Sequence, residues 1–119
     1  MKTQELKTPA FLVDIRIADK NAQAMTERIK RHGLRLRPHV KTHKTLAGSR
    51  LQVSGNFGGI TVSTLAEAWF FRDGGLNDIT YAYPITENKF GEVLELSRAL
   101  KHFHIVLDHP STLDKLDRF

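Results

Sequence analysis

One short segment of the sequence gathers most of the residues that could carry chemistry. It runs from Arg35 to Thr45 and reads Arg-Leu-Arg-Pro-His-Val-Lys-Thr-His-Lys-Thr. Lys41 lies inside it, between two histidines and close to a second lysine. Neighbouring cations and partial desolvation lower the pKa of an amine, and such an amine can attack a carbonyl carbon to form a Schiff base. Lys41 is therefore a candidate nucleophile.

The same segment has other interpretations. Strand alternation would place its basic or titratable residues on one face and its apolar residues on the other. The polar face holds Arg35, Arg37, His39 and Lys41, and the apolar face Leu36, Pro38 and Val40. This row fits the solvated face of an edge strand or an anion site. Nucleic-acid binding is disfavoured, because no aromatic residues are interleaved for base stacking.

The elements that position this segment follow from the alternating periodicity of the chain. We expect strands at 10–14, 34–41, 59–62, 78–83 and 103–108. Helices are predicted at 17–32, from about 45, at 65–73, at 87–100 and from 111, where Ser-Thr-Leu-Asp forms a capping-box pattern. Strands that alternate with helices predict an α/β fold with a parallel sheet.

Two architectures satisfy this order of elements. One is a small doubly wound sheet, and the other is about half of a (β/α)8 barrel. A closed barrel typically takes about 250 residues, and this chain has 119. In both architectures ligands bind at the carboxyl ends of the strands, where Lys41 is expected.

Composition excludes several classes of protein. The chain is 40% hydrophobic and 26% charged, with a net charge of +5 and no cysteine, so a disulfide scaffold and thiolate metal sites are ruled out. Its apolar runs fall far short of the roughly 20 residues of a membrane span. The polar stretch Met1–Thr8 is no secretory signal. We expect a cytoplasmic protein that binds neither membrane nor nucleic acid.

Four stretches of the sequence, taken in order, resemble one family. They are 8–14, 36–44, 59–68 and 78–84, and the string Arg-Pro-His-Val-Lys-Thr-His-Lys at 37–44 is the most specific. They resemble the D-threonine aldolase and D-serine dehydratase family. That family belongs to the alanine-racemase-like, fold type III enzymes, which use pyridoxal phosphate.

The resemblance implies a fold and a role for Lys41. Lys41 would form the Schiff base with pyridoxal phosphate. Residues 17–119 would be the N-terminal half of an alanine-racemase-like barrel, with about four βα units. Residues 1–16 would be a strand segment that belongs to a second β-domain. A half-barrel of this kind is expected to be open, with an apolar interior exposed.

The resemblance also implies an activity. The intact protein would be a lyase acting on a D-3-hydroxy amino acid, of the D-threonine aldolase or D-serine dehydratase type, and a homodimer. A divalent metal (zinc, manganese or magnesium) would be bound by ligands outside this chain, so the chain alone is expected to be incomplete or inactive. A racemase of the same fold and a small non-enzymatic α/β module that binds an anion or a partner are the alternatives.

Four further residues are predicted to contact the cofactor. His39 shares the face of Lys41, and His43 follows just past the strand end. Thr64 opens the helix that follows the predicted strand 59–62, and Tyr83 ends the predicted strand 78–83. No metal ligand is predicted among them.

The other polar and aromatic candidates have simpler explanations. Lys44 is expected to be a structural charge, and the helix dipole accounts for Glu67 in a first turn. Tyr81 is expected on the same face as the next tyrosine, in the core. Asp108-His109 resembles a metal or acid–base pair, but a helix-capping role is favoured. Trp69-Phe70-Phe71 is predicted to be core or interface.

Overall fold

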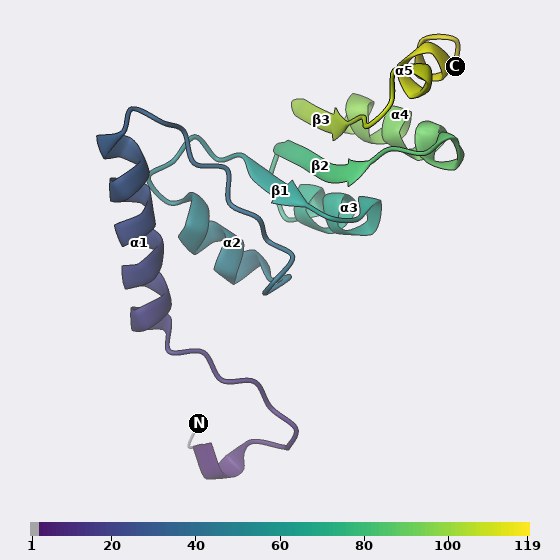
Figure 1. Cartoon of the computed structure of the whole chain (residues 1–119). Helices are drawn as coiled ribbons and strands as arrows, with labels where there is room; N and C mark the ends of the chain where they lie inside the picture. Colours follow the sequence, from purple (N-terminus) through teal and green to yellow (C-terminus); the bar gives the residue numbers. More distant parts are fainter. Residues whose placement is uncertain (1–2) are drawn as a thin grey trace.

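The computed structural model describes residues 3–119 of the chain. Its elements follow in the order η1 (Thr3–Glu5), α1 (Ile15–Arg31), α2 (Leu46–Val53), β1 (Ile60–Val62), α3 (Leu65–Asp73), β2 (Asp78–Pro84), η2 (Glu87–Lys89), α4 (Phe90–Ala99), β3 (His102–Val106) and α5 (Pro110–Asp117) (Figure 1). Within the described residues, no helix is both long and apolar enough to cross a membrane.

The three strands form one parallel sheet in the order β1-β2-β3. Helices α3 and α4 contact each other and pack against the strands, so they cover the same face of the sheet. Strand order therefore follows chain order without the reversal that defines a doubly wound sheet. Helix α1 lies apart from this sheet and packs against α2 (Figure 1).

The segment that carries Lys41 is not the strand predicted at 34–41. It makes one isolated parallel bridge, His39 to Thr61. Thr61 N–H donates to Pro38 O at 2.8 Å, and Val40 N–H donates to Thr61 O at 3.0 Å. The ladder extends no further because β1 is only three residues long and because proline has no N–H to donate. The predicted alternation survives, since Pro38 and Val40 are buried and His39 is half-buried.

The strand predicted at 10–14 was also wrong. Residues 10–14 form no strand, and Phe11 is 93% exposed. Asp14 instead caps α1, because its carboxylate accepts the N–H groups of Arg16 and Ile17 at 2.9 and 3.3 Å. A strand needs a neighbour for its backbone hydrogen bonds, and residues 3–119 offer none to this segment. The division at residue 16 into two domains stays a prediction.

The two faces of the sheet differ sharply in polarity. The face toward the helices is apolar: Ile60, Val62, Ile79 and Tyr81 are buried, and Phe103 and Ile105 of β3 are partly buried beside them. By alternation the opposite face carries Thr61, Asp78, Thr80 and His104. The expectation of an exposed apolar interior was therefore wrong. The uncovered face in this part of the chain is polar.

The aromatic cluster of α3 divides between core and surface. Phe71 is fully buried, Trp69 packs at the margin of the core, and Phe70 is 47% exposed.

Helix α5 begins earlier than the capping-box pattern predicts. His109 is its N-cap and accepts the N–H of Ser111 through Nδ1 at 3.2 Å. Pro110 occupies the first turn, where its missing N–H costs nothing. The capping role favoured for the Asp108-His109 pair is confirmed for His109, and Ser111 lies inside the helix.

Candidate functional site

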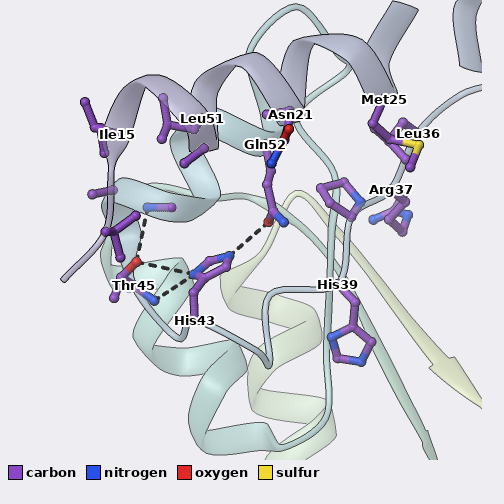
Figure 2. Close-up of a pocket in the computed structure, with 16 residues that line it drawn as sticks. Ile15, Asn21, Met25, Leu36, Arg37, His39, His43, Thr45, Leu51 and Gln52 are labelled. Carbon is purple, nitrogen blue, oxygen red and sulfur yellow. Dashed lines mark hydrogen bonds between the residues drawn. The ribbon is translucent and has the colours of Figure 1, made fainter. Parts of the chain in front are cut away.

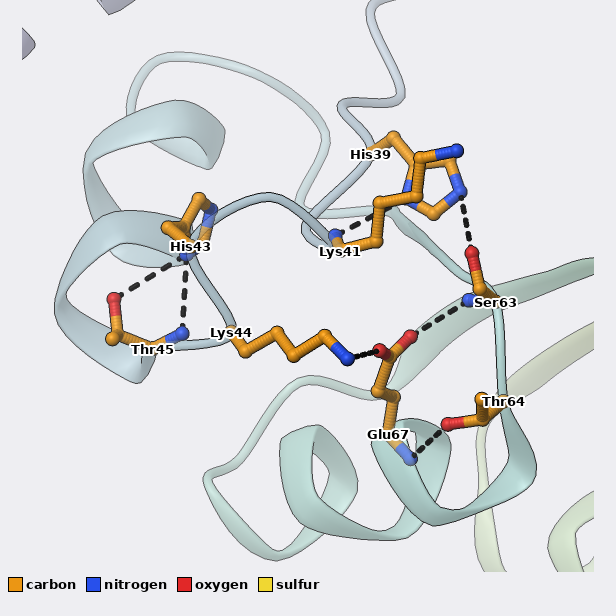
Figure 3. A network of polar contacts seen from close by, with 8 residues as sticks. All are labelled: His39, Lys41, His43, Lys44, Thr45, Ser63, Thr64 and Glu67. Atoms are coloured by element: carbon orange, nitrogen blue, oxygen red, sulfur yellow. Dashed lines mark hydrogen bonds and ion pairs between the residues drawn. The ribbon is translucent and has the colours of Figure 1, made fainter.

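The candidate site lies at the carboxyl end of the sheet. Lys41 directly follows the bridged segment, and Ser63 and Thr64 directly follow β1. Because parallel segments end at the same edge, these residues come together although more than twenty positions separate them (Figure 3).

His39 links the Lys41 segment to the end of β1. Its Nδ1 accepts the backbone N–H of Lys41 at 3.3 Å, and its Nε2 lies 3.3 Å from Ser63 Oγ. Since Nδ1 is an acceptor, the proton of the neutral ring is on Nε2, which donates to Ser63. Burial lowers the pKa of His39 below its ordinary 6.5, and the Lys41 ammonium lowers it further, against an opposing effect of Glu67. The ring is therefore a neutral donor near pH 7.

Glu67 is buried beneath the site. Its Oε2 accepts the N–H of Ser63 at 2.8 Å, and its Oε1 lies 3.0 Å from Lys44 Nζ. Thr64 caps α3 by accepting the N–H of Glu67 at 3.0 Å. Burial raises the pKa of Glu67, but the Ser63 N–H and the Lys44 ammonium outweigh it and hold the pKa below 4.5. Glu67 thus does more than complement the helix dipole, and Lys44 is its partner.

The ε-amine of Lys41 has no partner of this kind. Among residues 3–119, no hydrogen bond or ion pair involves Lys41 Nζ, and the residue is exposed. A free primary amine at the carboxyl ends of parallel strands can react with a carbonyl compound.

His43 points toward Gln52 of α2 (Figure 2). Its Nδ1 accepts the N–H of Thr45 at 3.1 Å, and its Nε2 contacts Gln52 Oε1 at 2.9 Å. A side chain on Gly48 would come within 2.7 Å of the His43 ring, so the glycine permits this close packing. His43 lines a cavity of about 650 Å³ between α1 and α2 rather than joining Ser63 and Glu67.

Thr64 and Tyr83 share a second cavity, of about 520 Å³, near the starts of α3 and α4. Tyr83 is 57% exposed, whereas Tyr81, which lines the same cavity, is buried. Lys89 Nζ donates to the Tyr81 hydroxyl at 2.8 Å and lies over both rings, 5.5 and 5.3 Å from their centroids.

The sequence alone did not predict Ser63 as a partner of His39 and Glu67, or Lys89 as a partner of Tyr81. Ser63 had a usable signal, because it follows the predicted strand 59–62 at the active edge. Lys89 had none, because its position depends on the turn between β2 and α4.

Arg37 belongs to the opposite end of the sheet. It pairs with Asp78 at 2.6 Å and also contacts the carbonyl of Ile60, so it binds the first residues of β1 and β2. The basic row of the sequence therefore divides. Arg37 is a structural cation, Arg35 lies over the Phe57 ring at 3.9 Å from its centroid, and His39 and Lys41 belong to the site.

Known proteins resemble this chain in sequence and in fold. No family model matches the chain. D-serine dehydratase of Schizosaccharomyces pombe is 36% identical over an alignment of 121 positions, gaps included, and the alignment covers 98% of this chain and 29% of the relative. The solved structure of D-threo-3-hydroxyaspartate dehydratase from Delftia sp. HT23 superposes with a TM-score of 0.91 at 34% identity, over 97% of this chain and 30% of that one. An alanine-racemase-like protein from Idiomarina loihiensis gives 0.86 at 31% identity, over 97% and 32%.

These likenesses define the class first. The chain has the fold of part of an alanine-racemase-like protein. Within that class it is homologous to the N-terminal portion of the family of D-serine dehydratases, D-threo-3-hydroxyaspartate dehydratases and 3-hydroxy-D-aspartate aldolases. It spans about 30% of the length of these relatives.

Proposed function

We propose that this chain supplies the cofactor lysine of a pyridoxal-phosphate-dependent lyase for D-3-hydroxy amino acids, and that Lys41 is that lysine. The observation that carries the proposal is the free ε-amine of Lys41 at the carboxyl edge of the sheet. The names of the relatives, which are dehydratases and aldolases of D-amino acids, support this substrate class.

The side chains around Lys41 fit such a cofactor. Its aldehyde requires an unpaired amine, which Lys41 offers. Its polar groups need hydrogen-bond donors, and the hydroxyl groups of Ser63 and Thr64, which accept hydrogen bonds from His39 and from the Glu67 N–H, can still donate at the same edge. The carboxylate of Glu67 is already satisfied by Lys44 and Ser63, so it repels a phosphate less than a free carboxylate would.

The residues then divide the work. Bound pyridoxal phosphate supplies an electron sink for the carbon beside the substrate amine. Lys41 would hold the cofactor, and its amine, when free of the cofactor, would be placed to act as the base that takes a proton from the substrate. His39 presents a neutral ring beside Lys41, and Thr64 and Tyr83 line the adjoining cavity. The His43 ring has both nitrogens engaged by Thr45 and Gln52, so it supports the loop.

The wider assembly is part of the same proposal. The sequential strand order and the single layer of helices support a (β/α)8 barrel in the intact protein. Its polar sheet face would then line the interior. A solved relative is described in a metal-free form. Among residues 3–119, no three His, Asp or Glu side chains are grouped so that they could bind a metal ion. We propose that any divalent metal is held by residues outside this range.

The test uses the full-length gene product with pyridoxal phosphate. We expect a visible absorbance band that is absent in Lys41→Ala and present in Lys20→Ala, a matched change on the exposed surface of α1. Borohydride reduction and peptide mapping should attach the cofactor to Lys41. A colourless wild-type protein, or a band that survives Lys41→Ala, would refute the assignment.

A further inference from the structure

A closed ring of polar contacts surrounds the loop that carries Lys41 (Figure 3). Lys41 N–H donates to His39, His39 donates to Ser63 Oγ, and Ser63 N–H donates to Glu67. The second carboxylate oxygen of Glu67 contacts Lys44 Nζ at 3.0 Å. Because Lys44 follows Lys41 by three positions, the chain itself completes this Lys41 ring. Glu67 is the residue that joins its two ends.

Lys44 shows that the loop needs such a restraint. Its φ of 48° is in the left-handed region, which residues with a side chain adopt at an energetic cost. Its N–H donates to Val40 O at 3.0 Å, which turns the chain tightly after the bridge. Its side chain is 62% exposed, so burial does not fix the loop. Besides this backbone bond and the contacts of the neighbouring His43, the side chain of Lys44 is restrained by its ion pair with Glu67.

We propose that Glu67 is a positioning residue for the cofactor lysine. By holding Lys44 and Ser63 at once, it fixes the loop 41–44 against the end of β1 and so directs the Lys41 amine toward the cofactor. Glu67 itself would touch neither cofactor nor substrate. This inference rests on the proposed function of Lys41.

Stability alone does not account for the arrangement. Placing the Glu67 carboxylate out of water costs free energy, which the Ser63 N–H and the Lys44 ammonium together offset, but an ion pair with a partner as exposed as Lys44 adds little net stability. What the ion pair does is restrict the loop to one geometry. Preorganised groups of this kind act on affinity and rate more than on folding.

The variant that tests this is Glu67→Gln in the full-length gene product, because glutamine keeps the shape and the acceptor for Ser63 but loses the charge. Glu87→Gln is the matched control, since Glu87 forms an exposed ion pair with Lys115 between η2 and α5. Amide hydrogen exchange at Lys41 and Lys44 is measured without cofactor, and the apparent Kd for pyridoxal phosphate from the absorbance titration. We expect exchange about tenfold faster and Kd about tenfold higher in Glu67→Gln, with Glu87→Gln unchanged in both.

Lys44→Met keeps the inference falsifiable if Glu67→Gln does not fold, because Lys44 is exposed. It should reproduce both changes, and the double variant should be no weaker than either single one, as for two residues acting through one contact. Wild-type exchange and Kd in folded Glu67→Gln, or in Lys44→Met, would overturn the inference. The proposed function is judged separately, by wild type against Lys41→Ala.

Discussion

Ser63 Oγ lies 3.3 Å from His39 Nε2 and connects the end of β1 to the segment that carries Lys41. The segment makes only one bridge to the sheet, so this contact is an important part of its attachment. The neutral imidazole of His39 thus connects the end of β1 to the backbone N–H of Lys41 through two hydrogen bonds.

His39 should titrate below its ordinary value of 6.5, because burial and then the Lys41 ammonium disfavour its charged form. Replacing Lys41 by Met should raise the pKa of His39, whereas Glu67→Gln should lower it by removing a favourable negative charge. NMR titration of the His39 ring protons measures both changes. An unshifted or reversed response would show that these charges do not act on the ring.

Glu67 should make folding stability depend on pH in the acid range. Its pKa in the folded state is below 4.5, so its contribution is present above the unfolded value and is lost as pH falls through the folded one. Glu67→Gln should lower the free energy of unfolding by less than about 1 kcal/mol at pH 7 and by still less as the pH is lowered. Urea unfolding at several pH values tests this, and a constant difference would contradict it.

The Arg37–Asp78 pair should support folding without affecting cofactor binding. Asp78→Ala leaves a half-buried guanidinium without its carboxylate and should cost about 2 kcal/mol. Because the pair binds the amino ends of β1 and β2, whereas Lys41 lies at the carboxyl end of the sheet, Kd for pyridoxal phosphate should stay the same in the folded variant. Thermal unfolding and the absorbance titration measure the two effects. A change in Kd would mean that the two ends of the sheet are coupled.

Tyr81 and Tyr83 should differ when each loses its hydroxyl. Tyr81→Phe removes the acceptor for Lys89 and should cost about 1 kcal/mol of unfolding free energy. Tyr83→Phe keeps the ring beneath Lys89 and should change stability by less than about 0.5 kcal/mol. Denaturant unfolding compares the pair. Equal losses would show that the Lys89 hydrogen bond contributes nothing.

The helices and the central strands could be predicted because their signals are local. The predicted helix 65–73 is α3, and Thr64 caps it as its position indicates. The helix predicted at 17–32 is α1, which begins at Ile15 because Asp14 caps it.

The parts that sequence reasoning missed depend on partners. Whether 34–41 or 10–14 forms a strand depends on a neighbouring strand of sufficient length, and β1 offers only three residues. The His43 ring is hydrogen-bonded to Thr45 and to Gln52 of α2, and strand alternation cannot reveal these contacts.

The polar face of the sheet has a consequence for how the sheet can grow. Water can wet Thr61, Thr80 and His104, so a single layer of helices is enough to shield the apolar side. A further strand with its following helix can be added at either edge without exposing apolar surface on the face that no helix covers. Extension of this sheet is therefore governed by the unpaired backbone groups at its edges, one of them the segment that leads to Lys41.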